Sequence, residues 1–244
     1  MMKMLTFAKR NAVEILRDPL NLCFGLGFPL ILIFLLSAIQ ANIPVSLFEI
    51  ESLAPGIAVF GLSFMTLFSA TLISSDRKSA LLQRLYTTPM RSLDFILGYT
   101  LPILPIALMQ SVVTYIAAII LGLKISINIL VCILFTIPIS LLFIALGLLF
   151  GSILNDKQVG GICGALLTNL TAWLSGVWFD LELVGGAFVS IANALPFVHA
   201  VELLRGVMSG NYDGFFGNLL WVLGYAVLAM LLAVIFFVRQ MKKQ

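Results

Sequence analysis

The chain has 244 residues, of which 61% are hydrophobic and 10% are charged, whereas about 25% of the residues in a soluble domain carry a charge. This composition excludes a soluble globular protein, and a net charge of +3 is too small to indicate a nucleic-acid partner. We therefore expect a single all-α membrane domain over residues 1–244, because helices satisfy their own backbone groups in lipid.

Residues 1–18 show an amphipathic pattern. Leu5, Ala8, Ala12 and Leu16 recur at spacings of three and four residues. Charged residues take the opposite side: Lys3, Arg10, Glu14 and Arg17. The pattern predicts a helix in the membrane interface with its cations near anionic headgroups; the alternative is a cytosolic start to the first span. Asp18 ends the helix, because the residue before a proline disfavours helical geometry.

Six apolar segments follow, each long enough to cross a hydrocarbon core of about 30 Å. They cover residues 20–40, 53–75, 94–122, 127–154, 158–180 and 215–238. We expect a kink at Pro29 in the first segment, and a break at Pro102 and Pro105 in the third.

Residues 181–213 are interrupted by Gly185-Gly186, Pro196 and Gly210. Neither half of this segment is long enough to cross the membrane. The segment therefore predicts two short re-entrant helices at the outer face, over residues 184–193 and 197–209.

Residues 76–91 form a charged island between two long apolar runs. A Lys or Arg at mid-bilayer costs about 2.5 to 3.5 kcal/mol on insertion scales, so this island lies in water or against a partner. Leu81, Leu82 and Leu85 form an apolar patch at helical spacing, and Thr88 precedes a proline that ends the helix. Two interpretations remain open: a helix that docks into a groove on a soluble partner, or a solvated loop.

The basic residues fall on one side of the predicted bundle. The N-terminus, the island, the turn at residues 155–157 and the C-terminus together hold twelve of the 14 Lys and Arg residues. Lys124 and Arg205 are the two on the other side. Since loops rich in Lys and Arg stay in the cytoplasm, we expect a multi-pass protein of the cytoplasmic membrane with both termini and the island cytoplasmic.

Motifs for catalysis are absent from the sequence. There is no GxxxxGK[ST], HExxH or GxSxG pattern, and the predicted spans hold essentially no ionisable residue that could carry protons. Cys23, Cys132 and Cys163 read as small buried hydrophobes, and His199, the sole histidine, as an ordinary residue of an amphipathic helix. We expect no catalytic, cofactor or metal site in the chain, so the energy for its work must come from outside it.

The order of these elements resembles the permease subunit of ABC-2-type ABC transporters, the transmembrane subunit of bacterial ABC exporters. Three pieces carry the resemblance: the helix before the first span, the stretch DRKSALLQRLYTTPMRSLDFILG, and the stretch ALPFVHAVELLRGVMSG before the sixth span. The chain departs from the family at Ala80, Leu81 and Leu82, where many members carry an acidic residue.

The resemblance implies two such subunits, identical or homologous, in the membrane with two cytosolic P-loop ATPase subunits that bind ATP and Mg. It implies that the island is a coupling helix seated in the ATPase, with seven contact residues: Arg77, Lys78, Leu81, Leu82, Arg84, Leu85 and Thr88. It implies an outer gate that contains Pro196, Glu202 and Arg205, of which the last two are placed to form an ion pair. Dimer packing would use Gly160, Gly161 and Gly164; the alternative is packing within one subunit.

We therefore expect the permease subunit of an ATP-driven exporter, not itself an enzyme, that moves an amphipathic or hydrophobic drug, antibiotic or peptide outward. Aromatic residues in the spans suit such cargo, although phenylalanine also faces lipid: Phe24, Phe28, Phe34, Phe60, Phe64, Phe68, Phe135 and Phe143. The alternative is a stand-alone six-span channel or scaffold without an ATPase. An intramembrane enzyme would need a catalytic pair within the spans, and the sequence has none.

Overall fold

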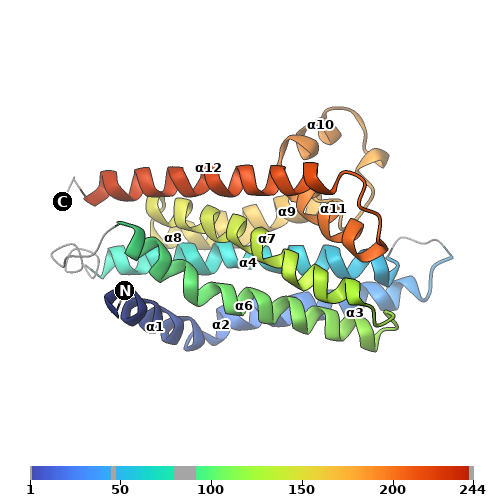
Figure 1. Ribbon diagram of the computed structural model, residues 1–244, viewed down its shortest axis with the longest axis horizontal. Helices are drawn as coiled ribbons and strands as arrows, with labels where there is room; N and C mark the ends of the chain where they lie inside the picture. The colour runs from blue at the N-terminus through green and yellow to red at the C-terminus, as the bar shows by residue number, and fades with distance from the viewer. Residues whose placement is uncertain (1, 45–47, 80–91, 242–244) are drawn as a thin grey trace.

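The computed structural model describes residues 2–44, 48–79 and 92–241. All regular secondary structure in these residues is helical, which confirms the all-α expectation. The long helices run side by side along the longest axis of the molecule, and α10 protrudes near one end (Figure 1). In chain order the elements are α1 (Met2–Leu16), α2 (Pro19–Leu22), η1 (Cys23–Gly27), α3 (Phe28–Gln40), α4 (Ile50–Lys78), α6 (Ser92–Ile120), α7 (Ile127–Ile153), α8 (Asp156–Val159), η2 (Gly160–Leu167), α9 (Thr168–Leu174), η3 (Leu181–Leu183), α10 (Gly186–Ala194), α11 (Pro196–Ser209) and α12 (Phe215–Met241).

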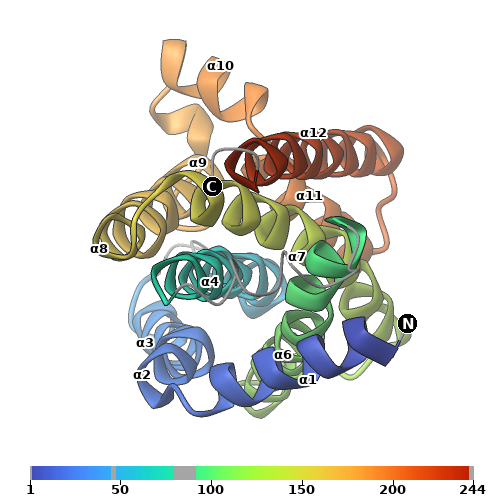
Figure 2. The same cartoon turned by 90° about the vertical axis from the view of Figure 1, so that its left-hand side faces the viewer.

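Helix α4 is the centre of the bundle. Figure 2 shows it surrounded by α3, α6, α7 and α8. Of the 18 most apolar consecutive residues of α4, 89% are buried inside the bundle. The corresponding share is 22% in Cys23–Gln40 and also 22% in Phe215–Arg239. The neighbouring helices therefore shield α4 from lipid, and any movement of α4 must be shared with them.

Helices α4 and α7 cross closely. A Cβ atom on Gly147 would lie 2.5 Å from the carbonyl oxygen of Thr66, and one on Gly151 would lie 2.8 Å from that of Ala70. Glycines four residues apart let helix backbones approach closely in lipid, and here they allow the Thr66 hydroxyl to donate to the carbonyl of Phe143 at 2.9 Å.

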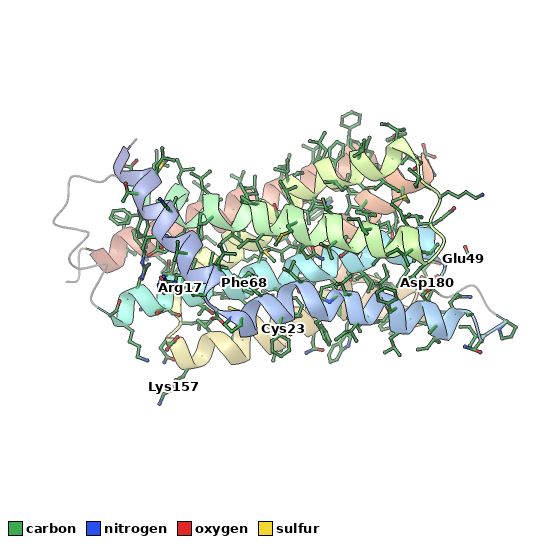
Figure 3. The ribbon with its side chains drawn as sticks, turned by 90° about the horizontal axis from the view of Figure 1, so that it is seen from below. Arg17, Cys23, Glu49, Phe68, Lys157 and Asp180 are labelled. Carbon is green, nitrogen blue, oxygen red and sulfur yellow. The ribbon has the colours of Figure 1, made fainter. Side chains whose placement is uncertain are left out.

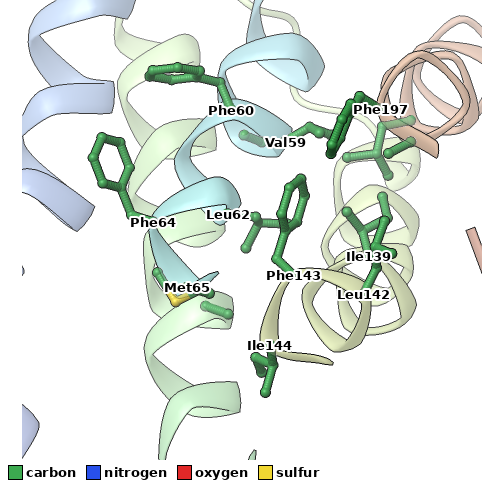
Figure 4. Packing of buried hydrophobic residues seen from close by; sticks show 14 of the residues in the cluster. Val59, Phe60, Leu62, Phe64, Met65, Ile139, Leu142, Phe143, Ile144 and Phe197 are labelled. Carbon is green, nitrogen blue, oxygen red and sulfur yellow. The ribbon is translucent and has the colours of Figure 1, made fainter. Parts of the chain in front are cut away.

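A buried apolar core continues beyond this crossing toward α11. The Phe143 ring lies between the side chains of α4 and Phe197 of α11 (Figure 4), and the two rings stack with centroids 6.2 Å apart. Both phenylalanines are buried. Helix α11 therefore packs directly on the central core.

Five helices in the described residues are long and apolar enough to cross a membrane, and six are if α10 and α11, bent by 78°, form one span. They are Cys23–Gln40, Ile50–Lys78, Leu93–Ile120, Ile127–Ile153 and Phe215–Arg239. The chain is thus a multi-pass membrane protein. The expected span 158–180 appears as the run α8–η2–α9, which is outside these five and whose central turns are a π-helix. The count of six spans stays a prediction.

Two local expectations are wrong. Helix α6 continues without a break through Pro102 and Pro105, since neighbouring groups can satisfy the carbonyls that prolines free in membrane helices. Cys132 and Cys163 are buried as expected, but Cys23 is exposed because η1 turns it away from α4 (Figure 3).

Charge divides the two ends of the bundle. Figure 3 shows Arg17 and Lys157 at one end and Glu49 and Asp180 at the other. We call these the basic end and the acidic end. The termini of α4 and α6 that flank the island, Lys78 and Ser92, both lie at the basic end.

Candidate functional site

The island connects two helices of the core at the basic end. Helix α4 ends at Lys78 and α6 begins at Ser92, and residues 80–91 lie outside the described part of the chain. Five of the expected coupling residues fall there: Leu81, Leu82, Arg84, Leu85 and Thr88. Their role stays a prediction. A force applied to the island would be passed to the bundle through α4 and α6, the two helices that it joins.

A buried carboxylate lies just before the island. Asp76 of α4 has no exposed surface. Nη1 of Arg10, from α1, lies 2.7 Å from its Oδ1 and 2.8 Å from its Oδ2, and the Tyr99 hydroxyl of α6 donates to Oδ2 at 2.8 Å. A buried charge is strongly unfavourable without such partners. We call Asp76, Arg10 and Tyr99 the Asp76 cluster; it joins α1, α4 and α6 at one point.

Helix α1 is docked on α6 around this cluster. The Asn11 amide, fully buried, donates to the carbonyl of Gly98 at 3.0 Å, and the Phe7 ring meets that of Tyr99 edge to face at 5.0 Å. A Cβ atom on Gly98 would come within 2.3 Å of the Phe7 ring, so only glycine allows this approach.

The expected apolar face of α1 is therefore only partly right. Leu5 and Leu16 are exposed as expected, whereas Ala8 is buried together with Phe7, Asn11 and Ile15. Helix α1 thus has exposed apolar residues and a separate buried side that packs on the bundle; its place in the membrane interface stays a prediction.

Arg10 is shared between two carboxylates. Its Nη2 lies 2.6 Å from Oε2 of Glu14. Burial raises the pKa of the Glu14 carboxyl, the positive charge of Arg10 opposes the rise, and the negative charge of Asp76 adds to it. The Arg10 guanidinium is therefore the positive charge that holds Glu14 and Asp76 together.

Arg77 and Lys78, the two expected coupling residues that are described, contact the turn between α7 and α8. Arg77 Nη1 donates to the carbonyls of Gly151 at 2.8 Å and Leu154 at 3.0 Å, which satisfies groups that the end of a helix leaves unpaired. Lys78 Nζ lies 3.1 Å from Oδ2 of Asp156. The end of α4 is thus tied to α7 and α8 on one side and to α1 and α6 on the other.

Sequence reasoning missed the Asp76 cluster because Asp76 was counted with the solvent-facing island. A signal was present: Asp76 follows Leu72 and Ile73 at helical spacings of four and three, so it continues their buried stripe. Its partners Arg10 and Tyr99 have no comparable local signal.

At the acidic end, the expected pair of Glu202 and Arg205 is confirmed at 3.1 Å. Arg205 also donates to the carbonyl of Gly176 at 3.0 Å and to that of Ser52 at 3.3 Å, beside a cavity of about 660 Å³. Pro196 is buried at the first turn of α11. Arg205 therefore holds α11 against α4 and the chain after α9; a gating role for the three residues stays a prediction.

The three glycines expected at a dimer interface differ in their surroundings. A Cβ atom on Gly160 or Gly161 would meet nothing within 4 Å, whereas one on Gly164 would lie 3.3 Å from the Leu67 side chain of α4. Gly164 therefore packs within the subunit, and Gly160 and Gly161 leave an open surface on η2.

Aromatic side chains gather where η1 and α3 pass α4. The rings of Phe24 and Phe64 stack at 6.5 Å, and Phe28 lies 6.0 Å from Phe60. Phe60 also meets Trp178 at 5.8 Å. Phe24 and Phe28 are exposed while Phe60 and Phe64 are buried, so this cluster presents an aromatic surface on the bundle. Within the described ranges, no three His, Cys, Asp or Glu side chains are grouped to hold a metal ion.

Comparison with known proteins gives two findings. The sequence model of a family described as "ABC-2 type transporter" matches residues 2–209. The chain is also 28% identical over 193 residues to ABC transporter G family member 20 of Dictyostelium discoideum. The alignment covers 77% of this chain and 26% of that protein, so the chain spans about a quarter of the length of the curated relative that it matches.

Proposed function

Because the chain belongs to the ABC-2 type transporter family, we propose that it is the permease subunit of an exporter whose ATP hydrolysis takes place on a separate P-loop ATPase. The chain itself is a transmembrane component of a transporter. ATP and Mg belong to the partner in this proposal, and the permease pairs with a second copy or a homologous permease.

The observation that carries the proposal is the position of the island. In the chain it follows the central helix α4 and precedes α6, and the Asp76 cluster binds both helices to α1 less than one helical turn before the end of α4. A push on residues 77–88 by the ATPase therefore acts on α4, α6 and α1 as a unit. Since 89% of the most apolar part of α4 is buried, its displacement rearranges the helices around it.

The division of charge supports an orientation with the basic end in the cytoplasm. Arg17, Lys157 and the island then face the ATPase, while the acidic end with Arg205 and Glu202 faces outward. The proposed location is the cytoplasmic membrane, with both chain termini on the cytoplasmic side.

The aromatic surface around Phe24, Phe28 and Phe60 supports an amphipathic or hydrophobic cargo, because aromatic faces offer large apolar contact area. Gly160 and Gly161 support pairing with a second permease, because small residues let helices approach in lipid. The substrate class and the dimer contact in the proposal are supported by these two surfaces.

The test is co-purification of the tagged chain with P-loop ATPases from its own cells. Leu82→Asp with Leu85→Asp should abolish recovery of the ATPase and of substrate export, because two charges replace the apolar patch. Gln83→Ser in the same segment is the matched control and should preserve both. If the native chain recovers no ATPase, or the double variant exports normally, the stand-alone channel or scaffold is the better description.

A further inference from the structure

Asn169 lies in the middle of the helical run α8–η2–α9. It is eleven positions from each end of the predicted fifth span. Gly164, before it, packs against Leu67 of α4, and Val177, after it, packs against Gly56 of α4. Figure 2 shows α8, the start of this run, at the periphery of the bundle beside α4. Asn169 is therefore at the depth of the middle of α4, which a spanning α4 places in the hydrocarbon core.

The Asn169 side chain is exposed and only partly hydrogen-bonded. Its Nδ2 donates to the carbonyl of Ala165 at 2.8 Å, whereas its Oδ1 accepts no hydrogen bond from the described residues. An amide carries two N–H donors and an acceptor oxygen, and lipid tails can pair with none of them. The oxygen and the second N–H of Asn169 thus require a polar partner inside the bilayer.

This exposed amide contrasts with the other surfaces that the bundle presents to lipid. On α6 and α7 the exposed side chains that the structure describes are all apolar. A polar side chain in a membrane span is expected to face a partner rather than lipid tails. The face of the run that carries Asn169 is therefore a surface for contact.

The residues beside Asn169 leave room for another helix. Gly161 and Ala165 lie eight and four positions before it and Trp173 lies four positions after it, and all three are exposed. Spacings of four place them on one side of a helix. A Cβ atom on Gly160 or Gly161 would meet nothing within 4 Å, and small residues of this kind let membrane helices approach closely.

A second copy of the chain is the partner that fits this face. In a two-fold symmetric pair a residue beside the axis meets its own equivalent, and an amide is complementary to itself. The Nδ2 group of each Asn169 then donates one hydrogen to its own Ala165 carbonyl and the other to Oδ1 of the second copy. Both amides become satisfied without water. The polar ester and phosphate groups of lipids lie at the membrane surface, so lipid does not supply this partner at mid-bilayer depth.

We propose that Asn169 is the central contact between two identical copies of this chain, each amide donating to the other in the middle of the membrane. The inference rests on the permease pairing in the proposed function and narrows it: the partner is a second copy, and Asn169 sets the register of the pair. A single polar residue in an otherwise apolar helix interface fixes register and the number of chains in the same way.

Association in lipid tests the contact directly. Photobleaching of single labelled full-length chains in liposomes, over a range of protein-to-lipid ratios, gives the dimerisation constant. Asn169→Leu should weaken pairing about ten-fold, because the hydrogen bonds between the copies are lost. Asn169→Gln keeps a self-complementary amide and should restore most of the affinity, which a purely steric role for Asn169 would not explain.

Asn42 provides the matched control. Its exposed amide also donates to the carbonyl four residues earlier, that of Ala38, at 2.8 Å, but it lies beyond the end of α3. Water can satisfy the rest of this amide, so Asn42→Leu should leave the dimerisation constant unchanged. An equal loss of pairing in Asn42→Leu and Asn169→Leu would overturn the proposal.

Cross-linking checks the register. With the three native cysteines replaced by alanine, Ala165→Cys should form a disulfide between copies on oxidation, which requires Cα atoms within about 7 Å, and adding Asn169→Leu should reduce the yield. The inference fails, and pairing stands, if Asn169→Leu dimerises as tightly as the native chain; loss of export in that variant would then assign the amide to cargo. A native chain that is monomeric at every ratio would overturn both the inference and the pairing, whereas recovery of the ATPase tests the exporter separately.

Discussion

Arg10 and Asp76 meet at 2.7 Å although 66 positions separate them in the sequence. One lies on the N-terminal helix and the other at the end of the central helix, directly before the island. In an exporter whose ATPase pushes on the island, this contact would couple α1 to the movement of α4.

The pair can be tested by removing one partner and then both. Arg10→Met leaves the Asp76 carboxylate buried with Tyr99 as its partner, and we expect a loss of about 1–3 kcal/mol in the free energy of unfolding. This is less than the roughly 3–5 kcal/mol of a fully buried pair, because the Arg10 side chain is 39% exposed. The measurement is denaturant unfolding of the purified chain in mixed micelles.

The double variant Arg10→Met with Asp76→Leu should recover much of that loss, because no buried charge remains. Lys9→Met, one position away and exposed, is the matched control and should change stability little. Equal destabilisation by Lys9→Met would show that α1 tolerates no apolar change at all, and that the ion pair is not the cause.

The close crossing of α4 and α7 predicts a position-specific effect of added volume. Gly147→Ala places a methyl group against the backbone of Thr66, which cannot move aside without shifting α4. Overpacking of this kind typically costs about 1–3 kcal/mol. Gly160→Ala, whose new methyl group would meet nothing within 4 Å, should be neutral in the same unfolding assay. Similar losses at both positions would contradict the tight crossing.

The open surface on η2 predicts a separate effect on assembly. Gly160→Leu with Gly161→Leu should weaken pairing of permease subunits in nanodiscs while leaving the unfolding transition of the single subunit unchanged, because the added side chains point away from the bundle. Mass measurement of the particles, with cross-linking as a second readout, checks this. A dimer fraction equal to that of the native chain would exclude this surface as the contact.

At the acidic end, Arg205 should matter more than Glu202. Arg205→Lys retains the charge but loses the planar fork that reaches two carbonyls, so α11 should detach from Gly176 and Ser52 and the melting temperature should fall. Glu202→Gln should have a small effect, since exposed ion pairs contribute about 0–1 kcal/mol and the Glu202 side chain is 50% exposed. The reverse order of the two variants would mean that the ion pair, not the carbonyl contacts, anchors α11.

The sequence by itself determined the features that depend on neighbouring residues. Hydropathy over about twenty residues identified a membrane protein and its long helices, the Lys and Arg distribution predicted the division of charge between the two ends, and the spacing of Glu202 and Arg205 predicted their ion pair. The breaks at Gly185-Gly186 and Pro196 likewise located the two short helices α10 and α11. Each of these signals is complete within one contiguous segment.

Only the tertiary structure decided which distant groups meet. The partners of Asp76, the approach of Gly147 to Thr66 and the stacking of His199 on Trp221 depend on which helix faces lie together. In lipid the hydrophobic effect gives little preference among apolar helix faces, so small residues and polar contacts select the packing. Such contacts join single residues that are far apart in the sequence, so the pattern of apolar residues within one segment does not predict them.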